Sequence, residues 1–361
     1  MGLLRFLLAI SVVIAHSSSV FGLNLVGGQI AVQAFYMISG FYMTLVLNEK
    51  YIGTNNRYKL FITNRLLRLY PIYWTVLIMT VLLSIIVYKF GSSGSFFGKL
   101  QPYYENIQSM NISAIFFLIL TNCIVVFQDL VMFLGLDIST GKLFFTSNFQ
   151  QTNPQLWSFL LVPQAWTIGI EITYYLIAPF IVRRKVKYIF LLIILSLILR
   201  IVLYYNGFQN DPWTYRFFPT ELLFFLLGTI SYHIYKKIKA RKIKKLYHKI
   251  IYGLILLITL SYTLFTIPYG IYIYLLLFFL SLPFIFILSK NWKIDRYIGE
   301  LSYPIYISHM LILTLVKYSH IKISELGVTI VLFSIIFSIF LNEFIAKKVE
   351  VYRQNRLNKN I

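Results

Sequence analysis

Long apolar segments run through this chain from its first residues to its last, and they constrain the fold more than any other feature. Of the 361 residues, 58% are hydrophobic and 12% are charged, whereas a soluble domain has about 25% charged residues. Most segments approach the roughly 20 residues that a membrane-spanning helix needs. The pattern predicts an all-α, polytopic transmembrane helix bundle in a lipid bilayer. We place the eleven apolar segments at residues 3–20, 26–47, 70–90, 112–136, 160–182, 188–205, 216–235, 250–267, 269–289, 301–318 and 324–346.

Lysine and arginine fall mostly between these segments, so the net charge of +21 reflects membrane topology and not a nucleic-acid partner. An anionic ligand is the alternative explanation of the charge. Positive clusters mark the cytoplasmic side of a membrane protein. They predict cytoplasmic N- and C-termini, an integral-membrane domain at 1–346 and a basic cytoplasmic tail at 347–361. The loops that are poor in positive charge, and that we expect to face outward, are 91–111, 206–215 and 319–323.

The region between residues 69 and 183 contains three apolar segments but has basic residues on both flanks. Two flanks on one side of the membrane require an even number of crossings, so one segment does not cross. Both 112–136 and 160–182 contain polar or helix-breaking residues. Inside a membrane, such residues are tolerated where the backbone lines a cavity that is enclosed by protein or filled with water. The expected architecture is therefore about ten crossings plus one re-entrant or interfacial segment.

Arg5 and His16 lie in the first apolar segment, which reads RFLLAISVVIAH and has no small-x-small cleavage site, so we expect a retained span. On a helix, eleven positions are about three turns, which places the two residues on one face roughly 16 Å apart. A neutral imidazole at membrane depth is a candidate general base. The alternatives are a buried histidine that donates to a backbone carbonyl and an Arg5 that anchors the helix at the cytoplasmic surface.

Arg65 and Arg68 occur in NRLLRLYP, three residues apart and therefore neighbours on a helix. Two guanidiniums at the cytoplasmic start of a span suit a phosphate group, although they can also serve only to fix the topology.

Two polar residues interrupt otherwise apolar motifs. Ser39 precedes a glycine in FYMISGF, where small residues favour close helix packing or close approach of a ligand. Glu171 in WTIGIE needs a cationic partner or a proton if it is buried. The sequence leaves open whether it belongs to a structural ion pair or to a catalytic site.

Tyr303, Tyr306 and His309 recur at three-residue spacing in LSYPIYISHM, so they line one face of a helix. They form either a substrate site or a structural polar cluster between helices. The chain has a single cysteine, Cys123, and no group of residues with metal-ligand spacing, so we expect no metal.

In content and order these motifs resemble those of the membrane-bound acyltransferase-3 family, the bacterial integral-membrane O-acyltransferases that modify surface polysaccharides. The matching pieces span nearly the whole chain: Arg5 with ten intervening residues to His16, then FYMISGF, RLLRLYP, WTIGIE followed by Tyr174 and Tyr175, RFFPTELLFFLLG and SYPIYISH.

The resemblance implies a multi-pass protein of the bacterial cytoplasmic membrane that takes acyl-CoA from the cytoplasm. His16 matches the family's essential histidine and Arg5 its partner. Arg65 and Arg68 match arginines placed near the CoA phosphates. Glu171 matches the motif glutamate, and His309 matches a late histidine.

The sequence-based hypothesis is O-acetyl transfer from acetyl-CoA to a hydroxyl of a surface-polysaccharide precursor or glycolipid. His16 would be the base, Glu171 would orient it, and Arg5, Arg65 and Arg68 would bind the donor. Other short acyl groups and an acyl-His16 intermediate stay open. The alternative from another class is a glycan or lipid exporter without transferase activity, although the inverted repeats typical of transporters are not evident in the sequence.

Overall fold

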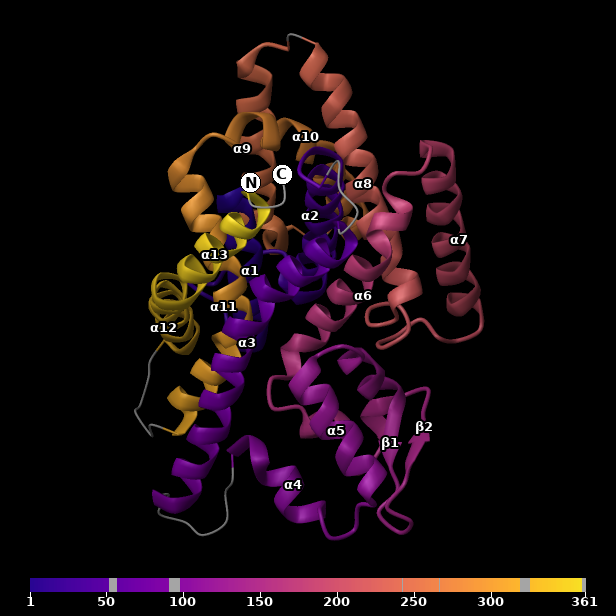
Figure 1. Ribbon diagram of the computed structural model, residues 1–361, viewed down its shortest axis with the longest axis vertical. Coiled ribbons are helices and arrows are strands. Elements are labelled where there is room, and N and C mark those ends of the chain that lie inside the picture. The colour runs from indigo at the N-terminus through magenta and orange to yellow at the C-terminus, as the bar shows by residue number, and fades with distance from the viewer. Residues whose placement is uncertain (52–56, 91–97, 242, 266, 319–324, 359–361) are drawn as a thin grey trace.

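The computed structural model describes residues 1–51, 57–90, 98–241, 243–265, 267–318 and 325–358, and most of these residues are helical (Figure 1). The expected outward loop 319–323 and part of the loop 91–111 lie outside the described residues. The α-helices are α1 (Gly2–His16), α2 (Gly27–Glu49), α3 (Arg57–Phe90), α4 (Gln101–Asn106), α5 (Ile112–Ile124), α6 (Trp166–Ile181), α7 (Val186–Tyr205), α8 (Phe218–Ala240), α9 (Lys245–Ser261), α10 (Gly270–Ser289), α11 (Lys293–Tyr318), α12 (Leu326–Leu341) and α13 (Lys347–Asn358).

Six stretches of described helix are long and apolar enough to cross a membrane, whereas α1 and α5 are shorter apolar helices. The six stretches lie in α2, α3, α7, α9, α10 and the run from α12 into α13. Many side chains on α7 and α9 are large, apolar and exposed, for example Ile194 and Leu257. Such surfaces are stable in hydrocarbon, so the structure is that of a multi-pass helical membrane protein.

The basic segments of the sequence gather at one end of the bundle, which we call the basic end. The first residues of α1, the start of α3 and helix α13 lie there together with the end of α8 and the start of α9 (Figure 1). At this end Arg183, which follows α6, donates to the carbonyl oxygens of Leu47 at 2.7 Å and Tyr51 at 2.9 Å. Asp295 accepts from the backbone amides of Gly2 and Leu3 and so caps the N-terminus of α1.

Helix α5 enters the bundle from the opposite end and the chain then turns back. The amide of Asn111, just before α5, donates to the carbonyl of Gly141 at 3.0 Å, so the excursion between them begins and ends at the same place. Its deepest point is near the middle of α3, where the Trp74 indole donates to the carbonyl of Cys123. The segment 112–136 is therefore the one that turns back, and 160–182 leads on into α6.

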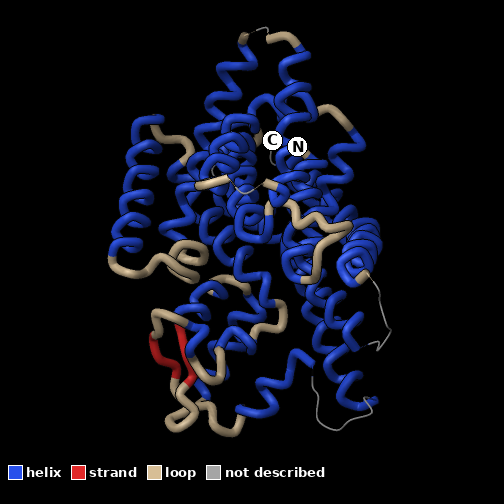
Figure 2. The backbone as a smooth tube through the Cα atoms, turned by 180° about the vertical axis from the view of Figure 1, so that it is seen from behind, coloured by secondary structure: helices blue, strands red, loops and turns tan. Residues whose placement is uncertain are grey.

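The returning part of this excursion contains a short antiparallel hairpin, β1 (Leu134–Leu136) and β2 (Leu143–Phe145), which is drawn in red at the lower left of Figure 2. The all-α prediction missed it. The hairpin forms because Asp137 accepts from Ser139 and Thr140 in its turn. These hydrogen bonds hold the pKa of the Asp137 carboxyl below its ordinary value.

Glycines allow a close helix crossing in the interior. A Cβ atom on Gly228 of α8 would lie 2.0 Å from the Met37 carbonyl oxygen of α2, and one on Gly40 would lie 1.9 Å from that of Phe225. The backbones of α2 and α8 thus touch at the two positions where the side chain is absent, as is common between membrane helices. Gly40 therefore serves packing, as its place beside Ser39 suggested.

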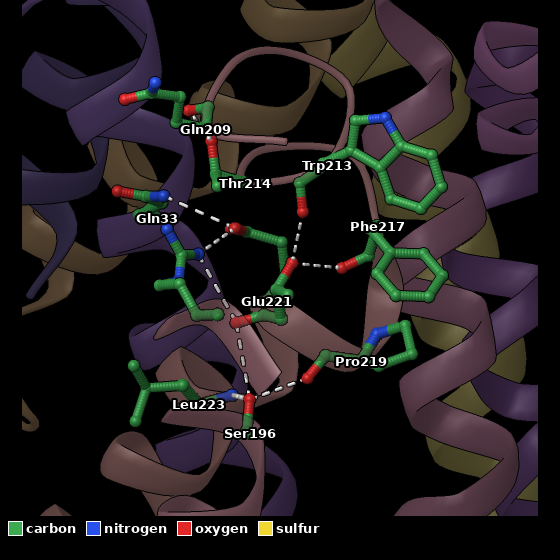
Figure 3. A network of polar contacts seen from close by, with 11 residues as sticks. Gln33, Ser196, Gln209, Trp213, Thr214, Phe217, Pro219, Glu221 and Leu223 are labelled. Carbon is green, nitrogen blue, oxygen red and sulfur yellow. Dashed lines mark hydrogen bonds and ion pairs between the residues drawn. The ribbon is translucent and has the colours of Figure 1, made fainter. Parts of the chain in front are cut away.

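A buried ion pair ties α7 to the same two helices. Arg200 Nη2 of α7 lies 2.6 Å from Glu221 Oε1 of α8, and Gln33 of α2 donates to the same oxygen at 3.4 Å (Figure 3). Ser196 completes the junction by donating to the Pro219 carbonyl and accepting from the Leu223 amide. Breaking such a pair by removing one partner leaves a buried charge, which costs about 3–5 kcal/mol.

Candidate active site

Two histidines from distant parts of the chain meet near the end of α1. The ring of His16 stacks on that of His309 of α11, with centroids 5.2 Å apart and an interplanar angle of 30°. His309 is fully buried, whereas His16 is exposed at the C-terminal end of its helix. An imidazole with one supported face and an open edge is well placed to exchange a proton with a bound molecule.

Hydrogen bonding fixes the tautomer of neutral His309. Its Nδ1 lies 2.7 Å from the Tyr306 carbonyl oxygen, which can only accept, so Nδ1 carries the hydrogen. The buried Nε2 has no hydrogen-bond partner in the described part of the chain. Nε2 therefore presents an unused lone pair at membrane depth beside His16, and a group of this kind requires an explanation.

Two cations lie within electrostatic reach of the histidine pair. Arg216 and Lys99 are the two cations whose charges act on His16. The guanidinium of Arg216 lies over the Trp166 ring, 4.3 Å from its centroid, and its Nε donates to both carboxylate oxygens of Asp211. The sequence singles out Arg216 only as a candidate buried charge without a role, and it gives Lys99 no role, because each lies far from His16 along the chain.

The predicted donor-binding arginines gather at the basic end. Arg5 lies within electrostatic reach of Arg68, and Arg65 is within reach of Arg68 as well. Arg65 is buried against the Phe61 ring and its Nε has no hydrogen-bond partner among the described residues. Several guanidiniums this close repel one another, so an anion bound between them would be stabilised.

Helix α13 adds an arginine that the sequence analysis assigned only to a basic tail. Arg353 is buried, lies within electrostatic reach of Arg65 and Arg68, and has a partnerless Nε in the described structure. Arg356 fastens the helix to α3 by donating to Asn64 Oδ1 at 3.0 Å and Thr63 Oγ1 at 2.9 Å. The arginine cluster, as we define it, therefore consists of Arg5, Arg65, Arg68 and Arg353.

Glu171 lies beside the arginine cluster. Its Oε1 accepts from Ser39 Oγ at 2.6 Å and from the Tyr175 hydroxyl, and its charge acts on Arg5. In the described part of the chain no hydrogen bond joins Glu171 to His16, so the expected orienting contact is not present. The partner of His16 is His309 instead, and Ser39 serves as a donor to the carboxylate.

The tyrosines of α11 hold the surrounding helices in place. The Tyr303 hydroxyl donates to the Leu69 carbonyl of α3 at 2.7 Å, and that of Tyr306 lies 2.8 Å from Thr167 Oγ1 of α6. Gln164, just before α6, donates to the Ile307 carbonyl at 2.6 Å. Tyr306 and His309 thus belong to one cluster next to His16, while Tyr303 lies between the histidine pair and the arginine cluster.

Helix α1 connects the two polar regions, because Arg5 belongs to the arginine cluster and His16 to the histidine pair. The helix and its site define a multi-pass membrane protein with a cluster of arginines at one end of α1 and a histidine pair at the other. A family model described as an acyltransferase domain matches residues 1–343. The chain belongs to this acyltransferase-3 family, as the motifs predicted, and is a membrane acyltransferase.

A relative in Aquifex aeolicus (strain VF5), described as an uncharacterized protein, is 26% identical over 213 residues, which are 56% of this chain and 93% of the relative. No solved structure matches the chain.

Proposed function

We propose that the protein transfers an acetyl or other short acyl group from cytoplasmic acyl-CoA to a hydroxyl of a surface-polysaccharide precursor or glycolipid. The observation that carries this proposal is the position of α1, which joins the arginine cluster to the histidine pair. Arg5 and His16 are eleven residues apart on this helix, a rise of about 16 Å. A donor with a phosphate-rich nucleotide at one end and a thioester at the end of a long arm suits this arrangement.

The arginine cluster supports the choice of an anionic donor. Glu171 is the carboxylate that acts on Arg5, and Glu350 is occupied by Arg353. Positive charge thus exceeds negative charge at a partly buried place, where phosphate oxygens would pair with guanidinium forks. We propose that the phosphates of CoA lie here and that the pantetheine arm follows α1 toward His16.

At His16 the proposed step is a direct acyl transfer. The imidazole takes the proton of the acceptor hydroxyl while the oxygen of that hydroxyl forms a bond to the thioester carbonyl carbon. The carbon–sulfur bond then breaks, and the same proton passes from the imidazolium to the departing CoA thiolate. A positioned base of this kind contributes roughly 10²- to 10⁴-fold. His309 supports the ring of His16, so we assign it a positioning role.

We propose that the basic end faces the cytoplasm of a bacterium and that the protein lies in its inner membrane. Positive charge is retained on the cytoplasmic side, which places both described chain ends there. The helices that would then cross are α1, α2, α3, α6, α7, α8, α9, α10, α11 and α12. With α5 as the re-entrant element, this arrangement has ten crossings.

The test is made on purified protein in nanodiscs with acetyl-CoA that carries a radiolabelled acetyl group. We expect CoA to raise the unfolding temperature, because a ligand that binds only the folded state stabilises it. We also expect labelled acetate or acetylated glycan to accumulate in step with free CoA. A protein that neither responds to CoA nor releases it, but moves a glycolipid across the bilayer, would be the exporter and would refute the transferase proposal.

A further inference from the structure

A carboxylate without a counter-charge lies near the tip of the re-entrant excursion. Asp129, which follows α5 in the chain, is 6% exposed, and its Oδ1 has no hydrogen-bond partner among the described residues. Within the same residues no charged side chain acts on it, and only its own backbone amide supports its charge. A carboxylate buried in this way is costly unless a cation or a proton neutralises it. The proposed transfer at His16 makes no use of it.

The backbone at this tip is strained. Helix α5 ends at Ile124, and the next residues include Val125 with a φ of 66° and Phe127 with a φ of 64°. A positive φ is a genuine outlier for a β-branched residue such as valine. Such strain persists only where the surrounding structure imposes it, and it is concentrated at functional sites.

Side chains of α3 satisfy the last carbonyl oxygens of α5 before the turn. The donors and the residues whose carbonyls accept pair as Tyr73 with Asn122, Trp74 with Cys123, and Tyr70 with Ile124. The carbonyl of Val125 comes next and accepts the backbone amide of Gln128 at 2.9 Å. A carbonyl oxygen has two lone pairs, and the C-terminal end of a helix carries partial negative charge. The Val125 oxygen can therefore accept a second, positive partner.

Gly169 of α6 brings this carbonyl and the carboxylate together. A Cβ atom on Gly169 would lie 2.8 Å from the Val125 carbonyl oxygen and 3.3 Å from Asp129 Oδ1. The two oxygens therefore border the same place against the backbone of α6. Gln128 Oε1, which is buried and has no hydrogen-bond partner in the described part of the chain, belongs to the residue next to Asp129. Oxygens of these three kinds only accept, so they suit a positive ion.

We infer that Asp129 and the Val125 carbonyl bind a sodium ion, and that this ion fastens the re-entrant tip to α6. A monovalent cation cancels the single negative charge, whereas a divalent cation would leave a buried positive charge. Without its water shell a sodium ion is smaller than a water molecule, which suits oxygens packed against a helix backbone. The inference concerns a site apart from the histidine pair and does not depend on the proposed function.

The same chemistry binds sodium in other membrane proteins. In transporters with helices that stop inside the bilayer, unwound backbone carbonyls and the C-terminal ends of these half-helices coordinate the ion. Here α5 is such a helix, and Val125 supplies the unwound carbonyl. Oxygen ligands are sufficient for sodium, so the site needs none of the grouped histidine and cysteine ligands that mark a transition-metal centre.

The experiment measures ion binding to the full chain in nanodiscs without acyl-CoA. Thermal unfolding is followed in sodium, potassium or N-methylglucamine chloride at one ionic strength, and the binding of radioactive sodium is measured by equilibrium dialysis. Asp129→Asn removes the charge with little change of shape. Glu105→Gln, the matched control, makes the same change at an exposed carboxylate on α4.

We expect sodium to raise the unfolding temperature of the unaltered protein to a plateau, because a ligand that binds only the folded state stabilises it. Potassium should have a smaller effect. Asp129→Asn should lose this response and weaken sodium binding by about tenfold or more, or 1.4 kcal/mol. In N-methylglucamine it should unfold at no lower temperature than the unaltered protein, since the uncompensated charge is gone. Glu105→Gln should keep both the response and the binding.

Three results would overturn the inference. The first is an unaltered protein whose stability does not depend on sodium, with Asp129→Asn equally stable, because this would show that the carboxyl is protonated instead. The second is an Asp129→Asn protein that binds sodium as the unaltered protein does. The third is an equal response to sodium and potassium in both proteins, which would be an effect of salt on the whole molecule.

Discussion

The Nδ1 of His309 donates to the Tyr306 carbonyl, 2.7 Å away, while the ring supports that of His16. One histidine therefore holds the other from a helix that begins almost 300 residues later in the chain. Because stacking fixes the position of an imidazole more than its basicity, the loss of His309 should misplace the base without removing it.

For His309→Ala we expect kcat to fall about 10²-fold, since a misplacement near 1 Å has an effect of that size, with the KM for acetyl-CoA unchanged. His309→Phe keeps a stacking ring and should recover part of the rate. His248→Ala is the control, because His248 is another buried histidine near a backbone carbonyl, that of Phe284. If His248→Ala lost as much activity, a general loss of structure would explain the effect.

Arg353 links the last described helix to donor binding. Arg353→Gln removes one guanidinium from the arginine cluster, and a hydrogen bond to a charged group contributes about 1.5–3 kcal/mol. We expect the KM for acetyl-CoA to rise about tenfold or more, with a smaller preference for CoA over dephospho-CoA in thermal-shift titrations. Lys348→Gln, exposed on the same helix, should change neither quantity. Equal effects of the two variants would contradict a specific role for Arg353.

The direction in which Glu171→Gln changes the KM for acetyl-CoA tests the role of this carboxylate. As a neighbour of Arg5, its carboxylate opposes the binding of phosphate, so Glu171→Gln should lower the KM for acetyl-CoA by roughly fivefold, about 1 kcal/mol. The amide oxygen still accepts from Ser39 and Tyr175, so the fold is kept. Steady-state kinetics at two salt concentrations measure the change. A large loss of kcat with an unchanged KM would instead support a role in orienting His16.

The crossing of α2 and α8 should tolerate no side chain at Gly228. The added methyl of Gly228→Ala would lie 2.0 Å from the Met37 carbonyl oxygen, and overpacking of this kind costs about 1–3 kcal/mol. We expect a lower midpoint of thermal unfolding in detergent. Gly253→Ala on α9 is the matched control, because its Cβ would meet nothing within 4 Å. Equal midpoints for the two variants would contradict the close crossing.

The sequence predicted local geometry well because helical periodicity is a local property. It placed Arg5 and His16 on one face, Arg65 beside Arg68, and Tyr306 beside His309. The parity of the basic flanks also required one segment to turn back between residues 69 and 183. Which segment does so could not be predicted, because it depends on the hydrogen bond between Asn111 and Gly141.

The sequence could not predict which side chains on different helices contact one another. Glu171 needed a partner by its chemistry, but the pattern could not tell whether His16, Ser39 or Arg5 would supply it. In the sequence, Arg353 looked like a positive residue that only fixes the membrane topology, because a basic tail and a basic helix docked on α3 have the same composition. In each case the answer depends on which helices pack together, and this depends on contacts such as the one between Gly40 and Phe225.

The most direct test of the account is the rate of acetyl transfer by His16→Ala, measured with labelled acetyl-CoA in nanodiscs. The variant keeps the arginine cluster, so CoA should still raise its unfolding temperature as it does for the unaltered protein. We predict a transfer rate lower by roughly 10²- to 10⁴-fold, the contribution of one positioned base. A His16→Ala protein that transfers acetyl at the unaltered rate would contradict the claim that this imidazole performs the chemistry.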